Sequence, residues 1–166
     1  PLELRDAVKD GVLAWNKAFE AAGFINAVEV KVQPDDADWD AGDIRYNVLR
    51  WASSPSPPFS GYGPSFVNPR TGQILGADIM LEYSSFTYRV KTEKIFETFS
   101  GEEFFEDEHS CQFSQVMQEN NLFAMIASRT IGDFSSREQH RIIYEALVDL
   151  SLHEVGHTLG LSHNFY

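Results

Sequence analysis

Residues 153–163 read HEVGHTLGLSH and supply three imidazoles and one carboxylate at fixed spacing. In an α-helix, positions i and i+4 lie on one face about 5–6 Å apart at Cβ, so the ring nitrogens of His153 and His157 can share one metal ion. Glu154 is rotated from His153 by about 100°, which makes it a poor ligand but places it beside a metal-bound water. The stretch therefore predicts a helix that carries a catalytic metal site.

A third ligand is expected from beyond this helix. Gly160 can end the helix in a left-handed conformation and turn the chain back, so that His163 approaches the same ion from another direction. Three protein ligands leave one position of a tetrahedral zinc ion open, which is typical of a catalytic rather than a structural zinc. The alternative is an amphipathic helix with surface histidines. Gly156 disfavours that alternative. Glycine inside a helix costs about 1 kcal/mol relative to alanine, so its presence indicates that a neighbouring group needs the small size of this residue.

These residues resemble the metzincin metallopeptidases, whose signature is His-Glu-x-x-His-x-x-Gly-x-x-His. The match is complete at His153, Glu154, His157, Gly160 and His163. Softer motifs resemble a bacterial group of large, secreted zinc-dependent metalloproteases, and they lie at residues 15–19, 43–46, 63–65 and 69–72. The resemblance implies one catalytic Zn²⁺ held by the three histidines, Glu154 as the catalytic residue, and an extracellular, periplasmic or cell-envelope location.

One feature departs from that family. Metzincins carry a methionine in a tight turn after the third histidine, whereas this chain ends three residues after His163. Its methionines, Met80, Met117 and Met125, all precede the motif. We therefore expect residues 1–166 to form a single, truncated catalytic domain that lacks the lower wall of the cleft, and a fragment of this kind can be inactive for that reason.

The composition is that of one globular domain. With 166 residues and 43% hydrophobic content, the chain is long enough to bury a core. No apolar run reaches the roughly 18 residues that a membrane-spanning helix needs. The single cysteine, Cys111, excludes an internal disulfide framework. The net charge of -12 disfavours the phosphate backbone of nucleic acids as a partner and makes a basic or neutral polypeptide more plausible, although the simpler interpretation is that the acidity only keeps the protein soluble.

The first third of the chain predicts one helix and two strands. Apolar residues at three- and four-residue spacing predict a helix over residues 2–22, closed by Gly23. Valines that alternate with charged residues predict a strand over residues 28–32. A second strand is predicted over residues 44–51, which are rich in branched and aromatic side chains.

A hairpin is predicted next, with arms over residues 62–67 and 73–83 and a turn over residues 68–72. In metzincins the first arm of such a hairpin is the edge strand over the zinc. An extended peptide can add to an edge strand through its unpaired N–H and C=O groups, so the resemblance implies a polypeptide substrate bound there. We expect an α/β (α+β) fold of the metzincin upper-subdomain type, with a twisted mixed sheet of about four strands, a backing helix and no opening strand.

Residues 84–134 exceed what a minimal metzincin places between the hairpin and the zinc helix. Helical periodicity over residues 91–99 and 112–128 predicts a helical insertion beside the cleft. Two further histidines, His109 and His140, have no ligand spacing and are expected at the surface.

The zinc helix is predicted to begin near Ser135, because Ser135 and Glu138 have the spacing of a capping box. It should extend to about Leu159. The apolar side chains that it should bury are Ile143, Leu147 and Leu150. Asp149, four residues before His153, either orients that imidazole or is simply solvated.

The predicted function is that of a zinc-dependent endopeptidase. Glu154 would take a proton from a zinc-bound water and pass it to the leaving amine. The alternative from another class is a zinc-containing module that binds an extended peptide without cutting it. The intact Glu154 disfavours this alternative, because a domain that no longer hydrolysed peptides would have no chemical need for a carboxylate there.

Overall fold

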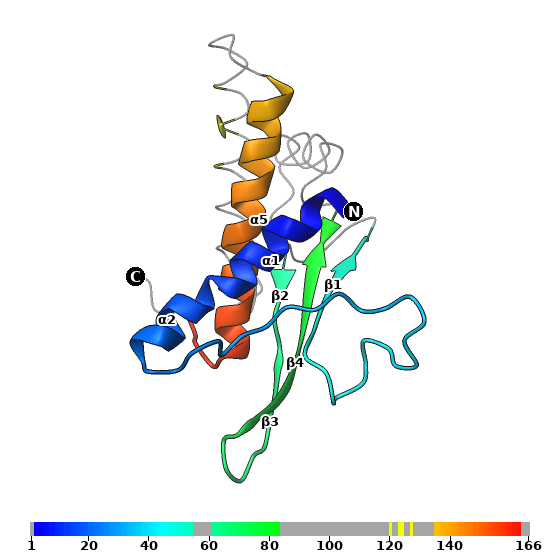
Figure 1. The fold of residues 1–166 in the computed structure, drawn as a ribbon, viewed down its shortest axis with the longest axis vertical. Coiled ribbons are helices and arrows are strands. Elements are labelled where there is room, and N and C mark those ends of the chain that lie inside the picture. The colour runs from blue at the N-terminus through cyan, green and yellow to red at the C-terminus, as the bar shows by residue number, and fades with distance from the viewer. Residues whose placement is uncertain are drawn as a thin grey trace, which may run out of the picture.

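A mixed sheet packs beside a long C-terminal helix, and a shorter N-terminal helix crosses that long helix (Figure 1). The structure is a computed structural model. It describes residues 2–54, 61–83 and 135–163, and four further residues, which are Asn120, Phe123, Ala124 and Ala127. The α+β class predicted from the sequence is confirmed.

The predicted insertion over residues 84–134 lies almost wholly outside the described residues, as do the predicted helix over residues 91–99 and His109. The four described residues of this segment fall within the helix predicted over residues 112–128, and all four are helical.

Four strands form the sheet: β1 (Val48–Ala52), β2 (Gly61–Tyr62), β3 (Ser65–Val67) and β4 (Ile74–Glu82). The longest strand, β4, is central. It pairs in parallel with β1 on one side and antiparallel with β2 and β3 on the other. The mixed sheet therefore has the predicted number of strands, but their identities differ from the prediction in two places.

The strand predicted over residues 28–32 is wrong. The side-chain amide of Asn16 donates to the carbonyl oxygen of Val28 and accepts from its N–H, both at 2.9 Å. The Asn16 side chain thus forms hydrogen bonds with the N–H and the carbonyl oxygen of Val28, which a neighbouring strand would otherwise bind. Because residues 28–32 make no strand pairing, their alternating valines do not join the sheet, and Val32 is 63% exposed.

The hairpin arm predicted over residues 62–67 is two short strands rather than one. β2 ends at Tyr62, and β3 begins at Ser65, after Gly63 and Pro64. Proline has no N–H to donate to a sheet ladder, which explains the interruption. The strand predicted over residues 44–51 is present as β1, but it starts at Val48. Residues 43–46 form a turn instead, in which the backbone N–H and the Nε of Arg45 donate hydrogen bonds to the Asp43 carboxylate.

The helix predicted over residues 2–22 is present in three pieces: the 3-10 turn η1 (Leu2–Leu4), α1 (Arg5–Leu13) and α2 (Trp15–Ala21). The long C-terminal helix is α5 (Ser136–Thr158). Its buried residues join a core cluster of six members, Val8, Ile79, Leu81, Ala146, Leu150 and Val155. Since these come from α1, β4 and α5, the cluster fixes the long helix against both the crossing helix and the central strand.

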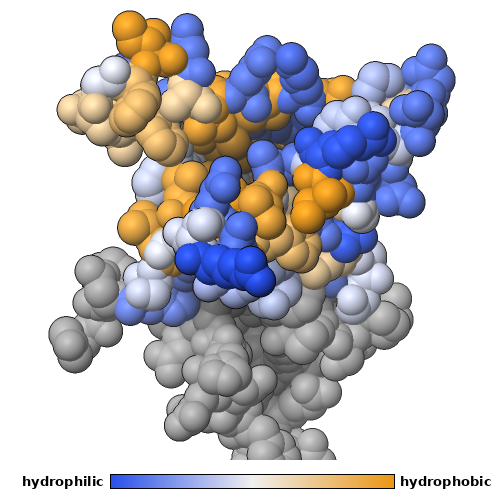
Figure 2. Space-filling view, turned by 90° about the horizontal axis from the view of Figure 1, so that it is seen from below, coloured by the Kyte–Doolittle hydropathy of each residue, from blue (hydrophilic) through white to orange (hydrophobic). Residues whose placement is uncertain are grey.

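The apolar side chains on the face seen in Figure 2 do not gather into one continuous patch. On the face seen in Figure 2, hydrophobic residues are interspersed with hydrophilic ones. Several exposed apolar side chains belong to the β3–β4 hairpin, namely Phe66, Val67, Ile74 and Leu75. Within the described part of the chain, no helix combines the length and the apolar character needed to cross a bilayer.

Candidate metal centre

The helix that carries the motif begins where the sequence predicts. The Ser135 side chain accepts a hydrogen bond from the Glu138 N–H at 3.2 Å, which caps the helix. The Glu138 carboxylate pairs with Arg141. The helix buries Leu147 and Leu150 as predicted, whereas Ile143 is only half-buried and the neighbouring Ile142 is buried instead.

The helix ends in the predicted left-handed turn. Gly160 has φ +89°, a conformation that a residue with Cβ rarely adopts. The Gly160 N–H donates to His157 O at 2.9 Å, and the Leu161 N–H donates to Gly156 O at 3.1 Å. These two bonds define a Schellman motif, and the reversal that it produces brings His163 back toward the helix.

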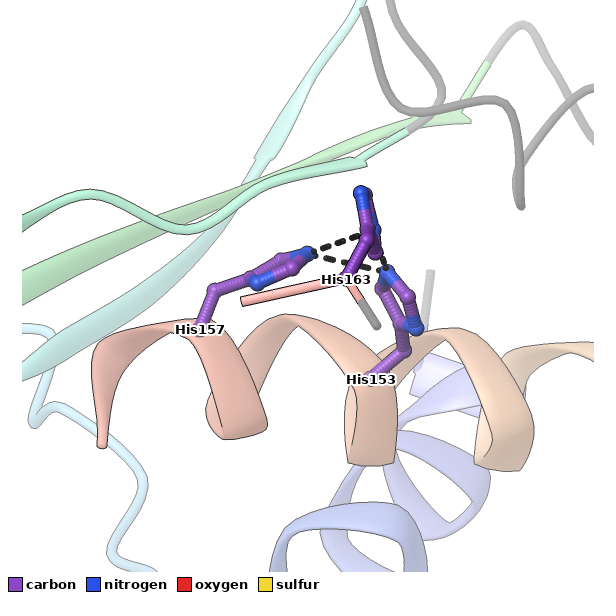
Figure 3. A group of neighbouring side chains, drawn as sticks. All are labelled: His153, His157 and His163. Atoms are coloured by element: carbon purple, nitrogen blue, oxygen red, sulfur yellow. Dashed lines mark hydrogen bonds between the residues drawn. The ribbon is translucent and has the colours of Figure 1, made fainter. Parts of the chain in front are cut away.

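The three histidines meet at their Nε2 atoms. His153 and His157 extend from one face of α5, and His163 reaches them from the chain after the turn (Figure 3). The Nε2–Nε2 distances are 3.0 Å from His153 to each of the other two and 3.1 Å between His157 and His163. Tetrahedral zinc with bonds of 2.0–2.1 Å would separate two ligand nitrogens by about 3.3 Å. The cluster therefore has nearly the spacing of a zinc site.

Hydrogen bonds alone cannot account for this triangle. Each Nε2 either carries a proton and donates or lacks one and accepts, so among three atoms at least two have the same role. At least one of the three close contacts would then join two donors or two acceptors. A cation shared by three lone pairs removes this conflict, which is the chemical reason why His153, His157 and His163 fit a metal ion.

Two observations indicate that lone pairs are available to such an ion. The pKa of His153 is lowered to about 4, mainly by burial and to a smaller extent by the neighbouring imidazoles of His157 and His163. This ring is therefore neutral at pH 7. The Nδ1 of His157 lies 2.9 Å from the Leu161 carbonyl oxygen, and only the nitrogen can donate. This bond places the proton on Nδ1 and leaves Nε2 free to act as a ligand.

Glu154 lies beside the cluster and is almost fully buried, at 1% exposure. Desolvation raises its pKa to about 7. Within the described residues its Oε1 has no hydrogen-bond partner, so no hydrogen bond to this oxygen offsets the cost of burying the charge. A carboxyl group that titrates near neutrality is suited to accept and return a proton.

Two glycines missed by the sequence prediction make room for this carboxyl group. A Cβ at Gly61 would lie 2.4 Å from Glu154 Oε1, and a Cβ at Gly63 would lie 3.2 Å from Glu154 Oε2 and 2.6 Å from its carbonyl oxygen. Gly61 lies in β2 and Gly63 directly follows this strand, and neither has a side chain that would occupy the space of the carboxyl group. The two closely spaced glycines were the available sequence signal.

The remaining candidate residues, Asp149 and His140, are both exposed and do not belong to the group of possible metal ligands. The metal group found among the described residues consists of His153, His157 and His163 alone.

A family model described as Met-zincin matches residues 135–166, which include α5, the turn at Gly160 and all three histidines. This match and the geometry of the histidines agree with the metzincin resemblance of the sequence. No curated protein and no solved structure matches the chain significantly. The match and the geometry of the histidines support a zinc metalloprotease-type module, and the mixed α+β fold is consistent with a metzincin-like fold.

Proposed function

We propose that the chain acts as a zinc-dependent endopeptidase, with zinc bound by His153, His157 and His163 and with Glu154 as general base. One observation carries the proposal. Three Nε2 atoms converge within 3.0–3.1 Å beside a buried carboxyl group that titrates near neutrality. A structural site would need no such group.

Zinc, when bound, would supply Lewis acidity toward a peptide carbonyl and would lower the pKa of water. The protein's own contribution centres on Glu154. With a pKa of about 7, this side chain can take a proton from the attacking water and then protonate the leaving amine. Burial favours the first transfer, because it raises the affinity of the carboxylate for a proton, and a pKa near neutrality still allows the carboxylic acid to release that proton to the amine.

An extended polypeptide is the substrate that the surrounding backbone favours. β2 pairs antiparallel with β4 and lies directly against Glu154 through Gly61. An extended peptide bound alongside β2 would bring its carbonyl groups close to the general base.

Glu154→Gln tests the proposal most directly. We expect the variant to retain about one zinc per chain and to lose peptide cleavage by about 10²–10⁴-fold, since glutamine cannot accept the proton. Elemental analysis and a fluorogenic peptide assay on the same sample measure both quantities.

The matched control is His157→Ala, which should lose the metal as well as the activity. Full activity in Glu154→Gln would contradict the assigned role. A wild-type chain that binds zinc and peptide without cleavage would contradict the endopeptidase and indicate a peptide-binding module.

A further inference from the structure

Trp15 contacts the metal helix directly beside both of its histidines. Its indole Nε1 donates to Leu152 O at 2.8 Å, although the two residues lie 137 positions apart. The same ring covers Gly156, where a Cβ would lie 3.0 Å from Trp15 Cζ2. Leu152 and Gly156 immediately precede His153 and His157. One side chain at the start of α2 thus touches the residue before each helical histidine.

Gly156 also contacts the chain that carries the third histidine. Its missing Cβ would lie 4.0 Å from Leu161 Cδ1, and its carbonyl oxygen accepts the Leu161 N–H. The Leu161 carbonyl in turn accepts the hydrogen bond of His157 Nδ1. Trp15, Gly156 and Leu161 therefore form one continuous set of contacts behind the three ligands.

Small movements of the helix matter at this position. Ring nitrogens lie about 6 Å from the helix axis, so a rotation of about 10° moves them by about 1 Å. Metal–ligand distances tolerate only about 0.2 Å. A side chain that fixes the rotation of α5 relative to residues 160–163 thus controls whether three nitrogens can reach one ion.

We propose that Trp15 is a positioning residue of the metal centre, which holds the last turns of α5 in the rotation that makes the three Nε2 atoms converge. The inference rests on the proposed metal site but not on peptide hydrolysis. The hydrogen bond to Leu152 O orients the indole ring relative to α5. The close approach of the ring to Gly156 fixes the distance between the ring and the helix backbone.

Metal affinity in two variants tests the proposal. Trp15→Phe removes the N–H donor, and Gly156→Ala puts a methyl group 3.0 Å from the ring. We expect each to weaken zinc binding by about 10–100-fold, as for other residues that orient metal ligands. Competition with a chromophoric chelator measures the affinity. The visible absorption spectrum of the Co²⁺-loaded protein, which reports coordination geometry, should change in both variants.

The double variant makes the test specific to this contact. Phenylalanine lacks the outer ring atoms that lie against Gly156, so it leaves room for the alanine methyl group. Trp15→Phe/Gly156→Ala should therefore bind zinc no more weakly than Trp15→Phe alone. Additive losses would overturn the proposal. Alanine has a higher helix propensity than glycine, so Gly156→Ala should not unfold α5 by itself. The zinc affinity of this variant therefore tests the proposal even if Trp15→Phe folds poorly.

Leu4→Ala is the matched structural control. Leu4, in η1, packs with Ala7 of α1 and Leu147 of α5, in a cluster that includes neither Leu152 nor Gly156. This variant should lower the melting temperature and leave zinc affinity and the Co²⁺ spectrum unchanged. An equal loss of affinity in Leu4→Ala and Trp15→Phe would reduce Trp15 to a packing residue. A wild-type chain that binds no zinc would overturn the metal site itself, whereas zinc binding without cleavage would overturn only the proposed function.

Discussion

Glu154 combines almost complete burial with a carboxyl oxygen that has no partner among the described residues. Its pKa is about 7 in the folded chain, against an ordinary value of 4.5. Because the folded state holds the proton more tightly than the unfolded state, this group stabilises the fold fully below about pH 4.5. That contribution is lost as the pH rises through about 7.

The pH dependence of stability is therefore predictable for the metal-free protein. Between pH 4.5 and 8, Glu154 should remove about 3 kcal/mol from the free energy of unfolding. Urea denaturation of chelator-treated wild type and Glu154→Gln, at a series of pH values, measures this. His153 contributes with the opposite sign, because its lowered pKa makes the folded state less stable as the pH falls from 6.5 toward about 4. This contribution is present in both proteins and therefore cancels in the comparison. A difference between the two proteins that stays constant with pH would contradict the prediction.

At the scale of elements, the site depends on how α5 ends. The helix presents two ligands on one face, and the turn at Gly160 returns the chain so that the third ligand meets them. A helix that continued past residue 160 would carry His163 away along its axis at about 1.5 Å per residue.

Gly160→Ala should therefore weaken zinc binding as well as the fold. A residue with Cβ in this left-handed conformation costs about 1–2 kcal/mol, so part of the population should end the helix differently. Gly72→Ala is a matched control, because Gly72 has φ +73° in the hairpin turn, and a Cβ there meets nothing within 4 Å. Chemical denaturation should show similar losses for both variants, and chelator competition should show weaker zinc binding only for Gly160→Ala. Equal zinc affinity in the two variants would argue against the role of the turn.

At the scale of the whole molecule, a metal ion would link α5 to the chain that follows it. An ion that binds only the folded state stabilises it by RT ln(1 + [M]/Kd), which is about 4 kcal/mol at a thousandfold excess over Kd.

Removal of the metal should thus lower the melting temperature by about 10 °C, given about 2–4 °C per kcal/mol for a chain of this size. Differential scanning fluorimetry before and after treatment with a chelator, and after zinc is restored, measures the shift. His157→Ala should melt at the same temperature with and without chelator. A shift of equal size in that variant would mean that the chelated ion lies elsewhere.

Local sequence was sufficient for the metal helix and its two ends. The spacing of His153 and His157, the cap at Ser135 and the turn at Gly160 all appear in the structure as predicted. Each depends on residues within a few positions of one another, so helical periodicity and backbone preference decide it. The α+β class was also within reach of pattern alone, whereas the number of strands agrees only because one predicted strand is absent and another is divided into β2 and β3.

Only the tertiary structure decided the features that depend on which distant surfaces meet. The valines of residues 28–32 alternate as a strand requires. The backbone N–H and carbonyl oxygen of Val28 nevertheless form hydrogen bonds with the side chain of Asn16 and not with a neighbouring strand. Glu154 titrates near neutrality because β2 covers it, with Gly61 against its carboxyl group. The contact of Trp15 with α5 joins residues 137 positions apart. Burial and desolvation arise between segments far apart along the chain, and no local pattern records them.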